Sequence, residues 1–200
     1  QKKGYSGVAI YTKKKPDEVI TGLDFDLADT EGRYIEIKFN KENLSIISLY
    51  LPSGSSGELR QNEKFRFMAF YEKILEKQLK SGRDYIICGD WNIVHKEIDI
   101  KNFKSNQKSS GCLPEERAWL DKLVDNMGWV DAFRVLNKEP HQYTWWSNRG
   151  QAYANNVGWR IDYQFITPNL KDKVTKVDIY KGEKFSDHAP LIIDYDFVLS

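Results

Sequence analysis

Polar side chains suited to phosphate chemistry follow an apolar run near the middle of the chain. Residues 85–88 read Tyr-Ile-Ile-Cys, and the chain continues as Gly-Asp-Trp-Asn, which places Asp90 and Asn92 two positions apart. A carboxylate and an amide at the end of a strand could hold a water molecule or a phosphate oxygen, with the carboxylate accepting a proton. An Asx turn that only caps the strand would use the same residues. The motif alone leaves both interpretations open.

A second carboxylate and an imidazole occur in two later motifs. Asp162 lies in the segment Trp-Arg-Ile-Asp-Tyr, where burial of a carboxylate is costly unless another group pairs with it. His188, one of three histidines, lies in Ser-Asp-His just before another apolar run. A carboxylate next to an imidazole fixes its tautomer and raises its basicity. Each residue alone could be structural, whereas both together would form an acid–base pair.

The elements that must position these motifs predict a layered α/β protein. Alternating or continuous apolar runs bounded by turn residues predict strands at residues 8–11, 34–39, 44–51, 85–88, 160–167, 174–180 and 191–197. Helical spacing of apolar residues predicts helices over residues 58–80 and 115–127. Because no linker or repeat divides the chain, we expect residues 1–200 to form a single domain.

The composition excludes several classes of protein. Hydrophobic residues make up 40% of the 200-residue chain and charged residues 30%, and no apolar run is long enough for a membrane helix. The two cysteines lack the spacing of a zinc site or a disulfide framework, which favours a reducing compartment. The 30 basic residues nearly balance the 29 acidic ones, so any affinity for nucleic acid must come from local patches.

Taken together, the three motifs resemble the exonuclease III type of apurinic/apyrimidinic (AP) endonuclease, within the endonuclease/exonuclease/phosphatase superfamily. They occur in the family's order, at the ends of predicted strands. Four further segments strengthen the resemblance: Gly-Tyr-Ser-Gly-Val-Ala at 4–9, Glu-Gly-Arg at 31–33, Leu-Tyr-Leu-Pro at 49–52 and Pro-Glu-Glu-Arg at 114–117. The resemblance covers essentially the whole chain.

The resemblance implies a fold and a reaction. The implied fold is a four-layer αββα sandwich of two facing mixed β-sheets flanked by helices, here without its first strands. The implied reaction is Mg²⁺-dependent attack of water on the DNA backbone 5′ to an abasic site, with Mn²⁺ as an alternative ion. The family also contains 3′→5′ exonuclease and 3′-phosphodiesterase activities. The implied partner is double-stranded DNA with abasic sites, bound by a monomer without a membrane.

Catalytic roles follow residue by residue from the same resemblance. Asp90 matches the carboxylate that activates the attacking water, and Asn92 matches its orienting neighbour. His188 matches the histidine that contacts the scissile phosphate, with Asp162 as its carboxylate partner. Tyr50 matches the tyrosine at the phosphate or the leaving group. The implied metal ligands are Asp187, Asp90 and Asn92.

The resemblance also implies a small pocket for the baseless sugar after it is flipped out of the duplex. Trp145, Trp159 and Ile161 match its walls, and Arg160 is the basic side chain between the last two. Arg149 lies in a polar, turn-rich segment and could insert into the duplex at the lesion. Ordinary core aromatic residues and a solvated loop are the competing interpretations.

Basic and amide side chains offer contacts to the DNA backbone. Arg33 follows a glycine-containing turn, and the segment 101–111 carries Lys101, Asn102 and Asn106 among other lysines and serines. Such side chains bind phosphates without reading bases, which gives salt-dependent and sequence-tolerant binding. A charge run of this kind can equally be a solvated face.

The chain departs from the family pattern at its beginning. The pattern starts well upstream of Gly4, with a strand that carries an Asn and a second strand whose Glu is the principal Mg²⁺ ligand, and this sequence contains neither. Mg²⁺ sites use only one or two carboxylates, so the loss of one weakens binding. We therefore expect a form that is truncated at its N-terminus relative to the family, with a weakened metal site.

Other functions and locations stay open at this stage. A non-specific nuclease, or a phosphodiesterase for phosphoinositides or sphingomyelin, would use the same Asp and His motifs. A catalytically silent DNA-binding fragment would follow from the missing Glu. The segment Gly-Trp-Arg-Ile-Asp-Tyr with Trp145 upstream favours the abasic-site branch. The turn at 53–57 is more typical of bacterial members of the family, which predicts a location in a bacterial cytoplasm, associated with the nucleoid. In a eukaryote, the expected location would be the nucleus.

Overall fold

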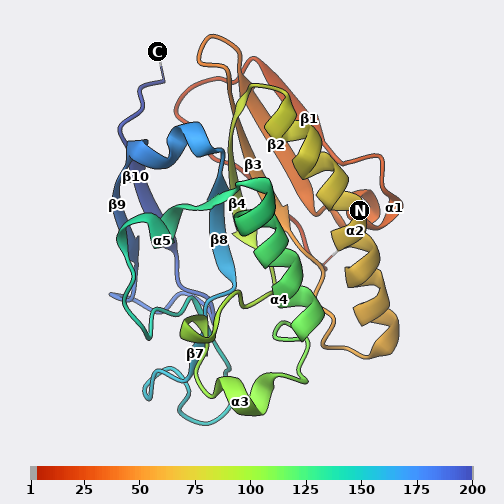
Figure 1. Cartoon of the computed structure of the whole chain (residues 1–200), viewed down its shortest axis with the longest axis vertical. Helices are drawn as coiled ribbons and strands as arrows, with labels where there is room; N and C mark the ends of the chain where they lie inside the picture. The colour runs from red at the N-terminus through yellow and green to blue at the C-terminus, as the bar shows by residue number, and fades with distance from the viewer. Residues whose placement is uncertain (1–3, 200) are drawn as a thin grey trace.

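A six-stranded mixed sheet forms the centre of the structure, which is a computed structural model that describes residues 4–199 (Figure 1). Its strands, in spatial order, are β1 (Glu18–Thr21), β2 (Tyr34–Phe39), β3 (Leu44–Tyr50), β4 (Asp84–Asp90), β8 (Asp162–Ile166) and β5 (Val130–Asp131). Strands β3 and β4 are parallel, and the other neighbours are antiparallel. The sheet therefore brings the end of β4 beside the start of β8.

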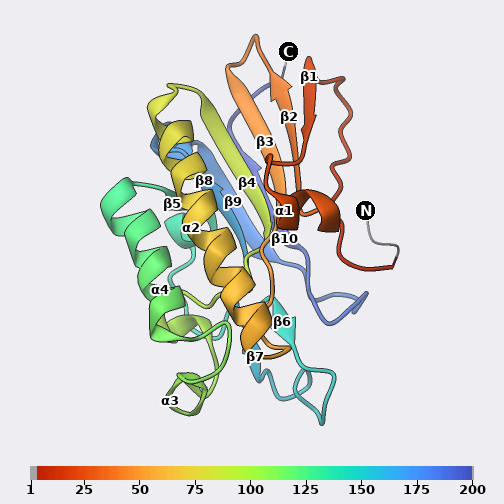
Figure 2. The ribbon, with the colours of Figure 1, turned by 90° about the vertical axis from the view of Figure 1, so that its right-hand side faces the viewer.

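Two helices cover one face of this sheet, α2 (Glu58–Lys80) and α4 (Pro114–Asp121), the second continuing into the π-helical segment η2 (Lys122–Met127) (Figure 2). Side chains of a strand alternate between faces, so Tyr85 and Ile87 of β4 point to the helices. There they join Phe67, Tyr71 and Leu120 in the largest buried cluster. Pro114 suits the first turn of α4 because its missing N–H has no partner there in any helix.

A second, two-stranded sheet lies against the other face of the central sheet. Strands β9 (Val174–Ile179) and β10 (Leu191–Tyr195) are antiparallel. Ile86 and Ile166 of the central sheet pack with Val174 and, at the edge of the cluster, Ile193. The predicted mixed α/β fold with more than one sheet and flanking helices is confirmed.

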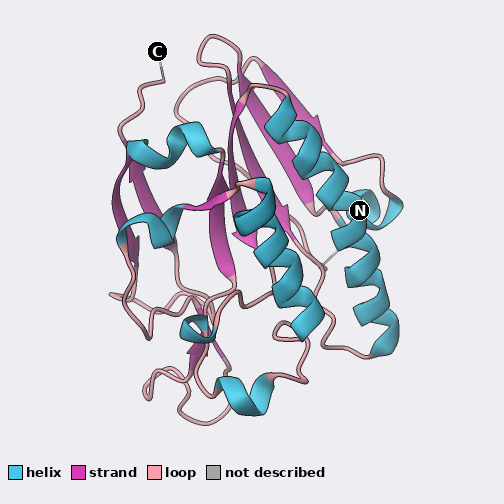
Figure 3. Ribbon diagram, in the orientation of Figure 1, coloured by secondary structure: helices cyan, strands magenta, loops and turns pink. Residues whose placement is uncertain are grey.

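Short elements fill the end of the molecule where β3 and β4 finish, and Figure 3 shows how much of this end is loop. The strands β6 (Trp145–Trp146) and β7 (Gly158–Trp159) pair there with each other. The remaining short elements of the described chain are α1 (Asp26–Glu31), η1 (Glu97–Asp99), α3 (Phe103–Asn106), α5 (Ala132–Leu136) and η3 (Pro168–Lys173). Within residues 4–199, no helix is both long enough and apolar enough to cross a membrane.

The predicted elements hold where the pattern is long or strictly alternating. The strand at 34–39 and the helix at 58–80 are found with the predicted bounds. The predicted strand at 8–11 is wrong, since these residues form no strand and Tyr11 is 97% exposed. The first edge strand of the described residues is β1 instead, which pairs with β2.

Candidate active site

A cavity of about 380 Å³ opens where β3, β4 and β8 meet the short strands β6 and β7. Polar and aromatic side chains from distant parts of the chain line it together: Tyr50, Ser53, Ser55, Asp90, Asn92, Ser110, Gly111, Trp145, Trp159, Ile161, Asp187 and His188. The sheet register sets Asp90 of β4 opposite Asp162 of β8. The predicted catalytic motifs therefore meet in one place.

Asp90 and Asn92 form a tight turn at the end of β4. The backbone N–H of Asn92 donates to Asp90 Oδ1 at 2.8 Å, and its Nδ2 donates to Asp90 Oδ2 at 3.1 Å and to the Leu51 carbonyl at 2.9 Å. Asn92 adopts the left-handed conformation, with φ of 51°, which asparagine tolerates better than most residues. The Asx turn is thus present, and it also holds the Asp90 carboxylate in a fixed orientation in the cavity.

Gly89 is required by the backbone at this point. Its φ is 151°, and a Cβ atom added there would lie 1.8 Å from the backbone oxygen of Leu49 on β3. No side chain can be fitted at that distance without moving one of the two strands. The glycine lets β3 and β4 run close together up to Asp90.

Asp90 lies in surroundings that favour its neutral form. Burial raises the pKa of this carboxyl, and the charge of Asp162 raises it further, to about 7. The nearby His188 and Lys64 act in the opposite direction. A carboxylate with a pKa near neutrality is well matched to accept a proton at physiological pH.

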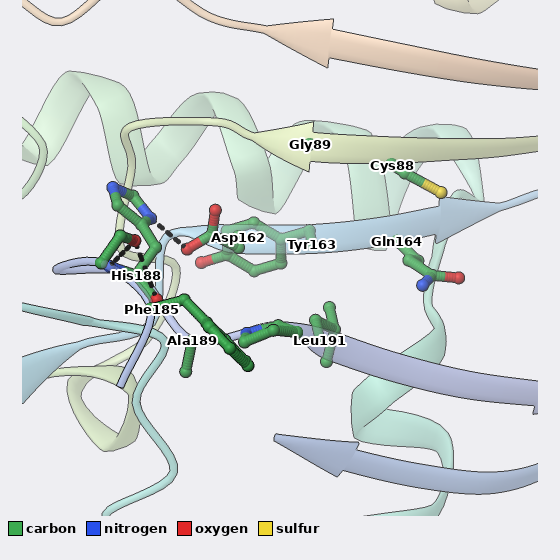
Figure 4. A pocket seen from close by; sticks show the side chains of 11 residues that line it. Cys88, Gly89, Asp162, Tyr163, Gln164, Phe185, His188, Ala189 and Leu191 are labelled. Carbon is green, nitrogen blue, oxygen red and sulfur yellow. Dashed lines mark hydrogen bonds and ion pairs between the residues drawn. The ribbon is translucent and has the colours of Figure 1, made fainter. Parts of the chain in front are cut away.

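His188 and Asp162 form the predicted acid–base pair. Figure 4 shows the imidazole pointing to the carboxylate, with 2.9 Å between Nδ1 and Asp162 Oδ2. Burial lowers the pKa of His188, but the hydrogen bond and charge of Asp162 outweigh it and raise the pKa to about 9. The ring is therefore an imidazolium at neutral pH, able to donate a hydrogen bond to an anionic oxygen.

Strand β6 places the segment that carries His188. Trp145 and His188 are bridged as antiparallel partners, Trp146 N donates to the Asp187 carbonyl at 3.0 Å, and Ala189 N donates to the Thr144 carbonyl at 2.7 Å. The Thr144 hydroxyl oxygen also accepts from Asp162 N at 3.2 Å. No motif marked Thr144 in advance, although it is fully buried and ties both members of the acid–base pair to one strand.

Tyr50 ends β3 at the cavity, where burial and then the charge of Asp90 raise the pKa of its phenol. The hydroxyl therefore stays protonated and can donate to a phosphate oxygen. Arg33 lies 4.7 Å from the centre of this ring and donates from Nη1 to the Tyr50 carbonyl at 3.1 Å.

The structure does not place Arg33 for the predicted contact with phosphate, because its side chain is only 2% exposed and pairs with Glu31 at 2.8 Å. Arg33 positions Tyr50 instead. The contact with phosphate stays a prediction. The acidic partner lies only two positions away in the Glu-Gly-Arg segment, but the burial of the Arg33 side chain becomes visible only in the fold.

The apolar part of the cavity is made of the predicted wall residues. Trp145 and Trp159 pack edge to face with 5.9 Å between ring centres, and Ile161 lies in the same cluster. The indole N–H of Trp145 donates to Asp187 Oδ2 at 3.1 Å, which fixes that carboxylate at the border between the apolar and the polar part. The cavity thus has an apolar wall beside its charged groups.

Arg160 is not among the side chains that line the cavity, so the structure does not place it for the predicted contact with substrate, which stays a prediction. Its side chain is fully buried and pairs with Asp99 at 2.8 Å and with Asp131 at 2.7 Å. Neighbours in a strand point to opposite faces, so Trp159 and Ile161 face the cavity while Arg160 points away. Arg160 anchors the segment that carries these two walls.

The other predicted substrate contacts lie outside the lining of the cavity. Arg149 is exposed in the loop between β6 and β7. Asn102 is exposed and Lys101 half-buried, and Lys101 N donates to the Gly158 carbonyl at 3.0 Å. Asn106 Nδ2 donates to the Asn102 carbonyl at 2.9 Å, so its amide stabilises the turn. Their contacts with DNA remain predictions.

The donor set suits an ion that keeps much of its water. Within residues 4–199 no group of three or more His, Cys, Asp or Glu side chains is placed to hold a metal ion. The carboxylates of Asp90 and Asp187 and the amide oxygen of Asn92 line the same cavity. Mg²⁺ often binds through one or two carboxylates, several waters and substrate phosphates. These three residues fit such an open site and do not form a closed one.

Several cavity residues escaped the sequence analysis. Ser53 and Ser55 follow β3, and Ser110 and Gly111 precede α4. Serines and glycines in turns are too common for their type alone to mark a site. The spacing also concealed that the loops 53–57 and 109–113, about 50 positions apart, meet at one wall.

The chain is similar to known proteins over most of its length. The model of the Endonuclease/Exonuclease/phosphatase family matches residues 1–188. An exodeoxyribonuclease of Bacillus subtilis is 36% identical over 95% of this chain and 74% of its own length. A DNA-(apurinic or apyrimidinic site) endonuclease of Dictyostelium discoideum is 34% identical over 97% of this chain and 54% of its own length.

A solved structure shares the arrangement of elements. The 3′ phosphatase NExo of Neisseria, bound to a product DNA hairpin, superposes with a TM-score of 0.84 at 23% identity, over 93% of this chain and 73% of that one. At that identity the likeness shows the fold. The extent of the family match and the identity to the bacterial relative establish that this chain belongs to the endonuclease/exonuclease/phosphatase family.

Proposed function

We propose that this chain is a DNA-repair phosphodiesterase that cleaves the backbone 5′ to an abasic site. The observation that carries the proposal is the cavity in which Asp90, Asn92 and the His188–Asp162 pair face an apolar wall of Trp145 and Trp159. Charged groups suited to hydrolysis of a phosphodiester and a surface suited to a sugar without a base thus share one cavity. Relatives named as nucleases of DNA support the same substrate class.

The residues divide the chemistry of hydrolysis between them. Asp90, with its pKa near 7, accepts a proton from the attacking water, and Asn92 holds the carboxylate in position. The imidazolium of His188 and the phenol of Tyr50 donate hydrogen bonds to phosphate oxygens as negative charge builds up on them. A bound Mg²⁺, held by Asp90, Asp187 and Asn92, would supply further positive charge at the phosphate.

Abasic sites are favoured because a nucleotide without a base is the easiest to turn out of the duplex. Extrusion costs least where no base must be unstacked or unpaired. The apolar side chains of Trp145, Trp159 and Ile161 give the exposed sugar a surface on which to pack.

The test is incision of a duplex that carries one abasic-site analogue, with Mg²⁺ and with a chelator, and with binding read in the same samples. We expect incision 5′ to the lesion that needs Mg²⁺, at a higher concentration than an intact metal site would require because the site is expected to be weakened, and its loss in Asp90→Asn. The matched control is Asp178→Asn, because Asp178 is an exposed carboxylate on β9. Unchanged incision by Asp90→Asn, or equal binding of intact and abasic duplexes without incision, would contradict the proposal.

A second candidate activity is 3′→5′ exonuclease action at the same cavity. The observation that favours it is the 36% identity to a relative named exodeoxyribonuclease. A duplex with a recessed 3′ end and no lesion separates the two activities, because only the exonuclease shortens it stepwise. Release of phosphate from a soluble inositol phosphate would instead support the phosphoinositide branch of the family.

A further inference from the structure

Two oppositely charged side chains lie fully buried between α2 and α4, away from the groups that would touch substrate. Lys64 and Glu116 have no exposed side-chain surface, and 2.6 Å separates Lys64 Nζ from Glu116 Oε1. Gln61 Nε2 donates a further hydrogen bond to Glu116 Oε1 at 3.0 Å. The proposed chemistry uses none of these three side chains.

Each member of the pair also holds a backbone group at the wall of the cavity. Lys64 Nζ donates to the carbonyl of Asn92 at 2.8 Å, so it holds the left-handed residue of the catalytic turn. Glu116 Oε2 accepts from the backbone N–H of Gly111 at 2.6 Å and of Leu113 at 3.0 Å. The pair therefore connects two loops that lie about 20 positions apart in the sequence.

These loops also contact each other directly. Val94 N donates to the carbonyl of Gly111 at 2.7 Å. A Cβ added at Gly111 would lie 3.0 Å from the Asn92 carbonyl and 3.1 Å from the Trp159 ring. A shift of the 109–113 loop would therefore change the position of the Asn92 turn and of one aromatic wall together.

Stability alone explains this arrangement poorly. Removing two charges from water costs several kcal/mol for each ion, and an apolar pair of similar size is often equally stable or more so. A lysine aimed at one carbonyl and a glutamate aimed at two N–H groups provide fixed directions that apolar side chains cannot. The geometry points to a role in orientation.

We propose that the Lys64–Glu116 pair positions the Asp90–Asn92 turn and the Gly111 loop for catalysis. The inference rests on the proposed function of this cavity, and it assigns to both residues a positioning role without contact to DNA. Loss of the pair would leave the carboxylate of Asp90 present but poorly oriented. The expected defect is then in turnover, since the side chains that bind DNA stay in place.

The test is the double substitution Lys64→Met with Glu116→Gln. The amide introduced by Glu116→Gln keeps one neutral and therefore weaker acceptor for the N–H groups of Gly111 and Leu113, and the loss of both charges together leaves no unpaired buried ion. We expect kcat for abasic-site incision to fall roughly tenfold to a hundredfold, the scale for misplacement of a reacting group, with KM changed less than about twofold. Amide hydrogen exchange at residues 91–94 and 110–113 should speed up.

Lys122→Met is the matched control. Lys122 follows α4 and pairs with Glu72 of α2 at 2.6 Å, so it also joins the two helical segments, but it is half exposed and touches neither loop. The Lys122→Met variant should have the same kcat as the unaltered chain and the same rates of amide hydrogen exchange at the two loops. A double variant with unchanged exchange at both loops, or with changed exchange and unchanged kcat, would overturn the inference.

The exchange measurement also separates this inference from the proposed function. If the unaltered chain neither incises nor prefers abasic duplexes, the proposed function fails. Faster exchange confined to the two loops would then still support the physical link made by the pair, and unchanged exchange would refute it.

Discussion

The charge of His188 depends chiefly on one carboxylate. Burial alone would lower the pKa of this imidazole, and the bond to Asp162 is the first contribution that raises it, followed by the charges of Asp162, Asp90 and Asp187. A folded-state pKa of about 9 lies above the ordinary value of 6.5. The pair therefore adds stability that is complete below about pH 6.5 and is lost as the pH rises through about 9.

Asp162→Asn should move the titration of His188 to lower pH. The amide cannot replace the negative charge, so burial acts with less opposition and the imidazolium is lost nearer neutrality. Binding of abasic duplex at pH 8 in the presence of chelator should weaken accordingly. An NMR titration of the His188 ring measures the midpoint directly, with Asp178→Asn as control. An unchanged midpoint would show that Asp162 is not the cause.

Trp159→Ala should weaken discrimination between abasic and intact duplexes. The indole forms one wall of the cavity, and Trp145 packs against it at 5.9 Å. We expect the ratio of the two dissociation constants to fall by about tenfold, the scale of one lost aromatic contact with a nucleotide. Trp159→Phe keeps an apolar ring and should retain most of the ratio. If the ratio of dissociation constants is equal in the unaltered chain, Trp159→Ala and Trp159→Phe, Trp159 does not contribute to recognition of the abasic site.

Between the elements, one buried group of charges joins η1, β5, α5 and the segment from β7 to β8. Asp99 accepts from Arg160 Nε at 2.8 Å and from Arg134 Nη2 at 2.5 Å, and Asp131 accepts from Arg160 Nη2 at 2.7 Å. Burial alone would raise the pKa of Asp99, but the two guanidinium groups outweigh it and lower the pKa to about 2. This group fixes the strand whose other face carries Trp159.

Asp99→Asn should destabilise the fold by roughly 3–5 kcal/mol, because Asp131 is then the one carboxylate of this group left to balance the guanidinium charges of Arg134 and Arg160. Since the folded-state pKa is lowered, the stabilisation by Asp99 is present above the ordinary pKa of 3.8 and is lost as the pH falls toward 2. Urea unfolding at pH 7 and pH 3 measures both effects. The exposed Lys38–Glu18 pair is the control, since Lys38→Met should cost less than about 1 kcal/mol.

The elements that sequence reasoning found are those whose own pattern is sufficient. Residues 35–39 alternate strictly between apolar and charged side chains, although side chains on both faces of β2 are buried, and the 23 residues of α2 carry one long apolar stripe. Strand β1 has four residues, mostly exposed, and exists because β2 offers a pairing edge. A strand of that kind leaves no periodicity to detect.

The carboxylates and the imidazole of the site could be predicted from the sequence, but the positions of the arginine side chains could not. Asp90, Asp162 and His188 lie at strand ends, where the sheet brings them together. The sequence suggests Arg33 as a contact to phosphate and Arg160 as a substrate-binding residue of the sugar pocket, whereas both side chains are buried in ion pairs in the structure. Basic side chains are usually exposed, so the sequence gives no reason to expect this burial. The acidic partners of Arg160 belong to separate segments of the chain, and Glu31, the partner of Arg33, is itself buried. The burial of these ion pairs depends on tertiary structure and cannot be read from the sequence.

For the molecule as a whole, affinity for DNA cannot come from net charge. The sum is +1, so we expect contacts with phosphate to come from local basic patches, and the proposed function places these near the cavity. The segment that contains α3 carries Lys101 and Lys104, the second of which is exposed, and its backbone is tied to β7 beside the cavity. This segment is well placed to approach the strand on one side of a lesion.

Replacement of Lys101 and Lys104 by alanine should therefore weaken all duplexes alike. Each lost phosphate contact should reduce the slope of log affinity against log salt by about 1. Titrations of abasic and intact duplexes across a range of salt concentrations give both quantities. Lys176→Ala, an exposed lysine on β9, serves as the control. A loss confined to the abasic duplex would show that these lysines read the lesion instead.

Gly89 affects how related sequences should be compared. Because β3 passes too close for any side chain at this position, the glycine should be retained in every relative that keeps this sheet, whether or not it still performs hydrolysis. Asp90 is under no such constraint, since its side chain faces the cavity. A relative with Gly89 but without Asp90 would thus have kept the architecture and lost the reaction, and such sequences would mark where the family has been recruited to other tasks.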